Sequence, residues 1–434
     1  MKATALSLLG QRTSDPPISW LMKMTLDHPS LISLAAGFTD SQSLPVCETR
    51  EMLGEMLRHA RSGQAALQYG TTAGDPRLRQ LTAERLQRLD ADASTQHYIS
   101  GRPKTLYSPD RLLLTNGSQQ LLYMVTEALC DPGDIVLVED PTYFVYLGIM
   151  QSHGLKARGI PLRGDGLDLD RLEETLRVLQ RSGELARVKL LYLVSYHQNP
   201  TGGTTTFAKK QAALECLHRY EKTAGHPIYL LEDAAYRELR FTGPSFPSAL
   251  AGERWADRVI YTGTYSKPFA TGVRVGFGFL PGPVLTTVRR IKGNHDFGTA
   301  SLLQHLLVRA LATGRYEEHL AVLHRRYARK ARIMMAALQE HFPAEVQAET
   351  PAGGLYVWAR LPKRVKSGPQ SALFKAALQQ EVLYVPGQLC YAEDPTRRKP
   401  DHEMRLSFGG ATEADIREGI ARLGQVLRRA VKPG

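Results

Sequence analysis

The sequence predicts an α/β fold in which a mostly parallel sheet lies between layers of helices. Short apolar runs recur between residues 111 and 280, and amphipathic stretches with a helical period separate them. The chain has 434 residues, more than one ordinary core holds, so a second and smaller domain is expected. Hydrophobic residues make up 43% and charged residues 23%, which is typical of globular proteins and argues against disorder.

The first part of the chain is predicted to be an arm followed by helices. Residues 1–37 are expected to be irregular, because prolines interrupt them at positions 16 and 17. Helical patterns dominate residues 48–90, with interruptions at the turn residues 69–70 and 74–76.

The middle of the chain alternates between strands and helices. The first predicted strand leads through a glycine turn into a helix over residues 119–129. Because helices connect the strands, the strands are expected to pair mainly in parallel and to be buried on both faces. The predicted strands are 111–115, 134–138, 189–194, 228–231, 259–262 and 275–280.

Near residue 300 the pattern changes to long helices, which continue to about residue 341. Strands are then expected at 354–360 and 404–408, with a final helix over 413–431. This shift predicts a second, α+β domain. The expected division is an arm with part of the small domain at 1–47, a large domain at 48–320 and a small domain at 321–434.

Charge and cysteine content exclude several classes of protein. The net charge is +12, but the basic residues are scattered, so nucleic-acid binding is not expected. A basic group between residues 325 and 332 has the spacing of one solvated helix face. The four cysteines form no C-x-x-C pair, so neither a metal site nor a disulfide framework is expected. No segment resembles a signal peptide or membrane span, which predicts a cytoplasmic protein without membrane contacts.

The segment most informative about chemistry ends at Lys267. This lysine follows a predicted strand, lies among small hydroxyl residues, and precedes Arg274. A lysine amine can condense with an aldehyde, while hydroxyl groups and a guanidinium hold a phosphate nearby. A positive field also favours a phosphate cofactor and anionic substrates. Taken alone, the segment fits an ordinary surface lysine equally well.

Three other segments also follow strand ends. Asp233 can pair with a protonated ring nitrogen and Tyr236 can donate to a phenolic oxygen, although a helix-capping Asp is the alternative. Asn199 precedes a proline that keeps it extended, although its Asn-Pro-Thr-Gly segment also suits a plain turn. Residues 115–119 can cradle an anion at a helix start, although a single glycine turn is weak support.

Together, nine segments in chain order resemble the class I/II aminotransferases of pyridoxal-phosphate (PLP) fold type I. The resemblance is to the branch with 2-aminoadipate, kynurenine and aromatic amino-acid aminotransferases, and it spans nearly the whole chain. It implies pyridoxal 5'-phosphate as cofactor, and a large domain with a sheet sandwiched by helices beside a smaller α+β domain. The segments are Ala35-Ala36-Gly37, Gln68-Tyr69-Gly70 with Gly74, Gly117-Ser118-Gln119, Asp140-Pro141-Thr142-Tyr143, Asn199-Pro200-Thr201-Gly202, Asp233-Ala234-Ala235-Tyr236, Ser266-Lys267 with Arg274, Gly353-Gly354 and Arg405-Leu406-Ser407-Phe408.

The resemblance implies roles around the cofactor ring. Lys267 is the implied catalytic residue, which forms a Schiff base with the cofactor and later moves the substrate proton. Asp233 pairs with the ring nitrogen, and Asn199 and Tyr236 bond the ring oxygen. Tyr143 stacks on the ring. The implied reaction moves an amino group from an L-amino acid to a 2-oxo acid such as 2-oxoglutarate by a ping-pong mechanism.

The resemblance also implies how phosphate and substrate are bound. Tyr69 reaches the phosphate of a neighbouring subunit, which implies a homodimer with a shared active site. Arg405 clamps the substrate α-carboxylate, with Asn199 and the backbone of Gly37 beside it. The phosphate ligands implied within one chain are Gly117, Ser118, Gln119, Thr264, Ser266 and Arg274.

Two differences from the family affect the expected substrate. Ala36 stands where the family often has glycine. Ser19 and Trp20 stand where relatives selective for acidic side chains can carry an arginine. If Trp20 faces the site, an aromatic or large apolar donor is favoured; core or interface packing is the alternative for this side chain.

Two alternatives keep the same fold and cofactor. The first is a lyase, decarboxylase or synthase, which would use the same lysine and aspartate. Arg405 favours transamination over these reactions, because a held carboxylate is retained. The second is a ligand sensor linked to a DNA-binding domain, for which the amino-terminal arm is too short to form a winged helix.

Overall fold

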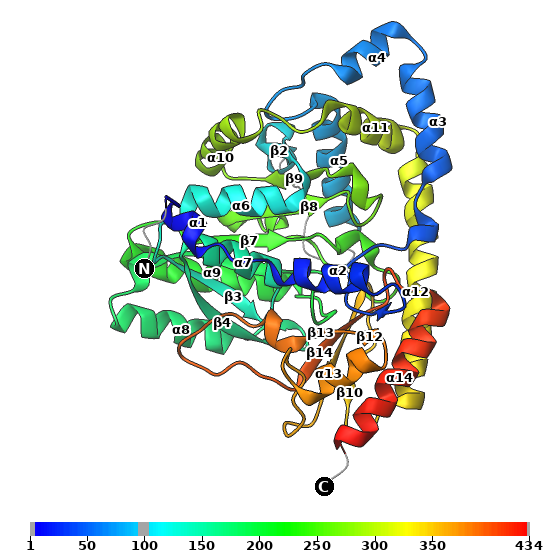
Figure 1. The fold of residues 1–434 in the computed structure, drawn as a ribbon. Helices are drawn as coiled ribbons and strands as arrows, with labels where there is room; N and C mark the ends of the chain where they lie inside the picture. The colour runs from blue at the N-terminus through cyan, green and yellow to red at the C-terminus, as the bar shows by residue number, and fades with distance from the viewer. Residues whose placement is uncertain (1–4, 94–103, 432–434) are drawn as a thin grey trace.

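The computed structural model of the chain describes residues 5–93 and 104–431 (Figure 1). A central sheet has eight strands in the order β2-β9-β8-β7-β6-β3-β4-β5. Strands β3, β4, β6, β7 and β8 pair in parallel, whereas β9 is antiparallel to both β2 and β8, and β5 is antiparallel to β4. The α/β prediction with a mostly parallel sheet is therefore confirmed. The strand bounds are β2 (Leu112–Thr115), β3 (Ile135–Asp140), β4 (Lys156–Arg163), β5 (Gly166–Leu167), β6 (Val188–Val194), β7 (Tyr229–Asp233), β8 (Val259–Thr264) and β9 (Gly276–Phe279).

Helices cover both faces of this sheet, because alternate residues of each strand point to opposite sides. In β3, Val136 and Val138 belong to one apolar core, and Ile135 and Leu137 belong to the other. Helices α6 (Gly117–Leu129), α7 (Phe144–His153) and α10 (Gly282–His295) contribute to the first core. The second core includes α5 (Pro76–Asp92), α8 (Leu169–Arg181), α9 (Phe207–Ala224) and α11 (Ser301–Ala312).

A second sheet has four antiparallel strands in the order β10-β11-β14-β13. Figure 1 shows the long helix α12 running along one side of the molecule to reach α14, and the two helices are in contact. The predicted domain boundary at residue 320 falls within α12, and the division into domains stays a prediction. The bounds are β10 (Gln347–Ala348), β11 (Tyr356–Arg360), β13 (Val385–Pro386), β14 (Glu403–Ser407), α12 (Arg315–His341), α13 (Ala372–Gln379) and α14 (Glu413–Val431).

The amino-terminal arm is more regular than the sequence predicts. It contains α1 (Leu8–Arg12) and α2 (Pro17–Asp27), so the prediction of an irregular segment is wrong there. Pro17 begins α2 instead of breaking it, because the first helical position needs no backbone N–H donor. The arm then forms β1 (Ile32–Ser33), which pairs in parallel with β12 (Val382–Leu383). The next residues lie alongside the second sheet, because the Leu34 carbonyl accepts from the Ser407 N–H and the Ala35 carbonyl accepts from Arg405, both on β14.

The remaining helices, α3 (Val46–Leu57) and α4 (Ala60–Leu67), extend away from the central sheet in Figure 1. The prediction of one solvated basic face over residues 325–332 is wrong for Lys330, which is 1% exposed. Its Nζ donates to Asp40 Oδ1 at 2.8 Å and to the Gly409 carbonyl at 3.0 Å. None of the helices described is both long and apolar enough to cross a lipid bilayer.

Candidate active site

The carboxyl ends of β6, β7 and β8 meet the start of α6 at one edge of the central sheet, where ligands bind in open α/β folds. A cavity of about 100 Å³ lies at this edge. Ten of the predicted site residues line it, together with Val194 and Ala235. These ten are Ser118, Gln119, Tyr143, Asn199, Asp233, Tyr236, Thr264, Ser266, Lys267 and Arg274.

Lys267 lies three residues beyond β8, and its amine faces the arm. Its Nζ donates to the carbonyl of Gly37 at 2.9 Å. The backbone of Gly37, which is predicted to lie beside the substrate, is therefore next to Lys267. Removal from water lowers the pKa of Lys267 to about 8, and the nearby charges of Arg274 and Arg405 contribute to the shift. The amine is therefore deprotonated over a larger fraction of molecules near neutral pH than an ordinary lysine, which makes it a better nucleophile.

One end of the cavity is suited to an anion. The N–H groups at the start of α6 have no capping side chain, and Gly117 adopts a φ of 74° there. A Cβ on Gly117 would lie 2.7 Å from Nη2 of Arg274, so glycine allows the guanidinium to approach the helix. Arg274 also donates from Nη1 to Ser266 Oγ at 3.3 Å. Helix N–H groups, a hydroxyl and a guanidinium together form a donor set suited to a phosphate.

Asp233 lies buried at the end of β7 and has no basic partner in the described part of the chain. Its Oδ2 accepts from the Tyr192 hydroxyl at 2.9 Å, and its Oδ1 accepts from the Ala235 N–H at 3.0 Å. Burial raises the pKa of Asp233 to about 6, although these bonds favour the ionised form. A cationic group of a ligand would supply the missing counter-charge.

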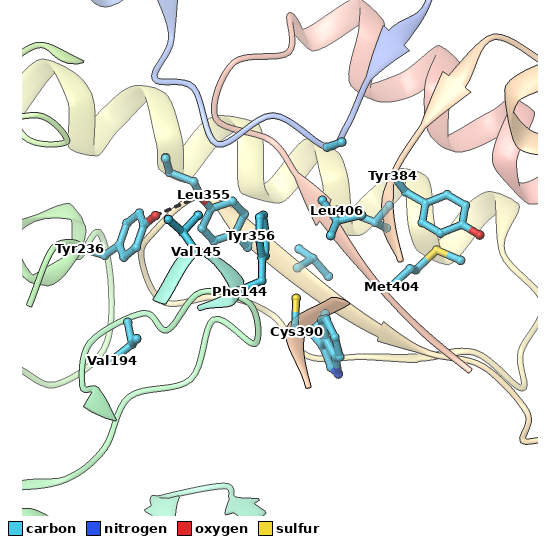
Figure 2. Close-up of a cluster of buried hydrophobic side chains, with 14 of the residues drawn as sticks. Phe144, Val145, Val194, Tyr236, Leu355, Tyr356, Tyr384, Cys390, Met404 and Leu406 are labelled. Atoms are coloured by element: carbon cyan, nitrogen blue, oxygen red, sulfur yellow. Dashed lines mark hydrogen bonds between the residues drawn. The ribbon is translucent and has the colours of Figure 1, made fainter. Parts of the chain in front are cut away.

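Asn199 connects the cofactor side of the cavity to the second sheet. It lies buried after β6, and its Oδ1 accepts from Nη1 of Arg405 at 2.6 Å. Its Nδ2 lies 3.5 Å from the Tyr236 hydroxyl, which is 3.0 Å from the hydroxyl of Tyr356. Figure 2 shows Tyr236 and Tyr356 with their hydroxyl groups directed toward each other.

Arg405 is buried on β14, and no carboxylate of the described residues pairs with it. Its Nη2 donates to the Ala35 carbonyl at 2.6 Å, and its guanidinium carbon lies 4.3 Å from the centre of the Tyr356 ring. The Nε group has no hydrogen-bond partner among the described protein groups. A buried guanidinium without a counter-charge is suited to an anionic ligand.

Two predicted residues lie elsewhere. Tyr69 is 85% exposed and packs edge-to-face against Phe297, so its role toward a second subunit stays a prediction. Trp20 packs against Phe374, with ring centres 5.7 Å apart, and does not line the cavity. The condition under which Trp20 would favour aromatic donors is therefore not met.

Sequence reasoning missed Tyr356, Tyr192 and the carbonyl of Ala35. Tyr192 and Val194 are two residues apart on β6, so their side chains lie on the same face of the sheet. Because Val194 lines the cavity, alternation along the strand could have predicted that Tyr192 points toward the same side. Tyr356 follows the recognised Gly353-Gly354 pair by two residues, but its contact with Tyr236 spans 120 positions and leaves no local pattern.

Comparison with known proteins agrees with this geometry. A family model described as aminotransferase class I and II matches residues 29–423. The 2-aminoadipate transaminase of Thermus thermophilus is 33% identical, over 94% of this chain and 92% of that protein. An aromatic-amino-acid aminotransferase of Thermococcus litoralis is 31% identical, over 98% and 94%. The crystal structure of a Pyrococcus horikoshii kynurenine aminotransferase, a complex with PMP, superposes with a TM-score of 0.86 at 29% identity, over 99% and 98%.

Proposed function

The chain belongs to the class I and II aminotransferases and is a pyridoxal-phosphate-dependent enzyme; we propose that it transfers the amino group of an L-amino acid to 2-oxoglutarate or a similar 2-oxo acid by a ping-pong mechanism. One observation carries the proposal. A lysine with a lowered pKa lies between an anion-binding helix start, a buried carboxylate without a basic partner and a buried guanidinium without a counter-charge.

The residues fit pyridoxal phosphate at four points. We assign its phosphate to Arg274, Ser266 and the N–H groups at the start of α6, with Thr264 in support. We assign its ring nitrogen to Asp233, whose raised pKa indicates a site that lacks a cation. Its ring oxygen is assigned to Asn199 and Tyr236, and its ring face to Tyr143; this set lines the same cavity.

When bound, the cofactor withdraws electrons from the substrate Cα and so acidifies its C–H bond. Arg405 binds the substrate α-carboxylate, and Asn199 Oδ1 holds that guanidinium in place at 2.6 Å. Lys267 Nζ would serve as the base that takes the proton from the substrate Cα and as the acid that gives it back, a task that suits a pKa of about 8. Asp233, ionised beside a cation, keeps the ring nitrogen protonated.

The retained carboxylate argues for transamination over decarboxylation. A decarboxylase must release the α-carboxylate, whereas Arg405 lies in a buried, hydrogen-bonded position suited to holding it. For the donor, we propose an aromatic or large apolar amino acid. The support is the pair Tyr143 and Tyr236 in the cavity wall, with Tyr356 packed against Tyr236, together with the relatives named for kynurenine and aromatic amino acids.

We also propose a homodimer whose subunits share their active sites through Tyr69. Large apolar side chains are exposed around it, and a second copy of the chain would bury them. They include Leu67 and Phe297, which line one pocket together with Tyr69.

The test is a visible absorption spectrum of the purified protein, repeated after addition of single amino acids. A good donor should replace the yellow cofactor band with the band of the aminated cofactor, and 2-oxoglutarate should restore it. Lys267→Ala should lower the rate of this interconversion by at least ~10³-fold, because it removes the amine to which we assign the proton transfer. A yellow protein that no amino acid changes reversibly would instead support a lyase or a sensor. A protein that stays colourless with added pyridoxal phosphate would overturn the cofactor assignment.

A further inference from the structure

A second cavity, of about 530 Å³, is lined in part by Gln198 and Thr201, which flank Asn199 and Pro200 in the sequence. Its walls are the hairpin of β4 and β5, the loop over residues 201–205, and strands β10 and β11 with the residues beside them. It shares no lining residue with the cofactor cavity. It therefore lies between the central sheet and the second sheet, and the proposed reaction does not use it.

Two buried polar side chains line this cavity without a partner for one of their polar atoms. Glu139 is 0% exposed and Trp358 is 5% exposed. No described protein group bonds Oε1 of Glu139 or Nε1 of Trp358. Buried polar atoms are normally hydrogen-bonded, so the unpartnered atoms of two residues that line one cavity point to a binding partner other than the protein.

Two guanidinium groups give the cavity a positive side. Arg163 and Arg360 both line it and remain partly exposed to solvent. Arg163 pairs with Asp168 through its Nε and Nη2 atoms. Nε of Arg360 lies 3.4 Å from Oε1 of Glu403. Each guanidinium has five N–H donors, so both keep donors for a ligand. Glu349 also lines the cavity, and its carboxylate disfavours negative charge at its own position.

We propose that this cavity is a second binding site, which takes a small carboxylate and positions its anionic group at Arg163 and Arg360 with an acceptor atom toward the indole N–H of Trp358. Burial raises the pKa of Glu139 to about 8, so at neutral pH this side chain is largely protonated and Oε1 acts as a donor. The two buried side chains and the two guanidinium groups then offer hydrogen-bond donors, which match the oxygen acceptors of a carboxylate.

The contacts of Glu139 link this site to the substrate-binding residues. Its Oε2 accepts from Gln198 Nε2 at 2.7 Å and from the Val194 N–H at 2.9 Å. Gln198 directly precedes Asn199, which holds Arg405. Trp358 is also the cross-strand partner of Arg405 between β11 and β14. A ligand that moves Glu139 or Trp358 would shift the apparent KM for the amino acid through these contacts.

Tryptophan fluorescence of the holoenzyme tests the proposal, because the chain has three tryptophans and only Trp358 lines the cavity. In a Trp20→Phe/Trp255→Phe background, we would titrate succinate as the probe, inorganic phosphate as a second anion and sodium chloride as the ionic-strength control. Succinate should change the emission saturably in the millimolar range. Arg163→Ala and Arg360→Ala should each weaken that response by about tenfold. Arg171→Ala, an exposed arginine on α8 that pairs with Glu174, is the matched control and should leave the response unchanged.

Succinate also resembles a substrate, so the active site needs a separate control. A response that survives in Arg405→Ala but weakens in the Arg163 and Arg360 variants would support the second site. A response that follows Arg405 alone would assign the probe to the active site and overturn the proposal. So would equal affinity for phosphate, which would show an unspecific anion site. No saturable change up to about 50 mM succinate would show a cavity filled by solvent only.

Discussion

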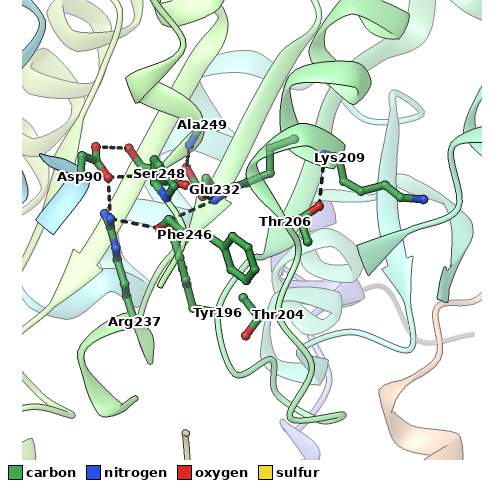
Figure 3. Close-up of polar contacts among 12 residues, drawn as sticks. Asp90, Tyr196, Thr204, Thr206, Lys209, Glu232, Arg237, Phe246, Ser248 and Ala249 are labelled. Carbon is green, nitrogen blue, oxygen red and sulfur yellow. Dashed lines mark hydrogen bonds and ion pairs between the residues drawn. The ribbon is translucent and has the colours of Figure 1, made fainter. Parts of the chain in front are cut away.

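Two regions on either side of β7 bury ionisable side chains, and they treat charge in opposite ways. Behind the active site, Lys210 Nζ lies 2.9 Å from Glu232 Oε1 with both side chains fully buried, and Arg237 pairs with Asp90. Figure 3 shows this network, in which Ser248 also bonds Asp90. In the active site, Asp233 and Arg405 are buried and Lys267 is half-buried, yet no described group forms an ion pair with any of them.

The pKa shifts follow this difference. Burial alone would raise the pKa of Asp90, but Arg237 and the bonds from Ser248 bring it below the ordinary value. Burial raises the pKa of Asp233 to about 6, because no such cation faces it. Glu232 and Asp233 are neighbours on one strand and point to opposite faces. The paired charge of Glu232 thus stabilises β7 within the fold, whereas the unpaired charge of Asp233 is available to a ligand of opposite charge.

Breaking a pair in the structural network should give the largest loss of stability. Lys210→Met leaves Glu232 buried without its cation and removes bonds to the Tyr196 hydroxyl and the Pro247 carbonyl. The free energy of unfolding should fall by about 3–5 kcal/mol, measured by denaturant titration. The adjacent Lys209→Met, which loses a contact with the exposed Asp165 and a hydrogen bond to the Leu167 carbonyl but leaves no buried charge unpaired, should cost only about 1 kcal/mol.

The double variant Lys210→Met/Glu232→Leu sharpens this test. An apolar pair of similar size removes both charges, so most of the lost stability should return. If the double variant is no more stable than Lys210→Met, the loss arises from the packing of α9 against β7 and not from the unpaired charge.

In the active site, the corresponding change should cost activity and little stability. Arg405→Lys keeps the positive charge but cannot bond Asn199 and the Ala35 carbonyl in the geometry of a planar guanidinium. We expect kcat/KM for the amino acid to fall by about 100-fold, mainly through KM, with the unfolding midpoint nearly unchanged. Arg422→Lys, on the exposed side of α14, is the matched control. Equal loss in both activity and stability would place Arg405 with the structural network instead.

Much of the fold and of the cofactor cavity can be predicted from the sequence, because local patterns specify them. The final helix, Glu413–Val431, has the predicted bounds, and the cavity-lining residues follow strands that apolar runs identify. Strand β4 escapes prediction, because its sequence mixes basic residues with glycine and proline. Local spacing places Lys330 in solvent, because nothing near it in sequence reveals Asp40, 290 positions away. Contacts of this range depend on tertiary packing, which local periodicity does not encode.

The smallest expected effect tests the unpaired carboxylate itself. In the folded apoenzyme Asp233 binds its proton up to about pH 6, above the ordinary value of 3.8. The folded state therefore holds more protons than the unfolded state between these values, so stability falls as pH rises through this window. Above pH 6 the cost is complete, and Asp233→Asn should raise the free energy of unfolding of the apoenzyme by about 1–3 kcal/mol at pH 8. At pH 3 the gain should disappear.

The same variant should do the opposite to function. With pyridoxal phosphate bound, the neutral amide introduced by Asp233→Asn cannot keep the ring nitrogen protonated, so the amino-acid half-reaction should slow by at least about 100-fold. Asp90→Asn is the matched control in the structural network, where the carboxylate is paired, and it should lower stability at pH 8. If Asp233→Asn destabilises the apoenzyme as Asp90→Asn does, then Asp233 is held by the protein alone. The contrast between a charge that the fold has paired and one kept for the cofactor would then not hold.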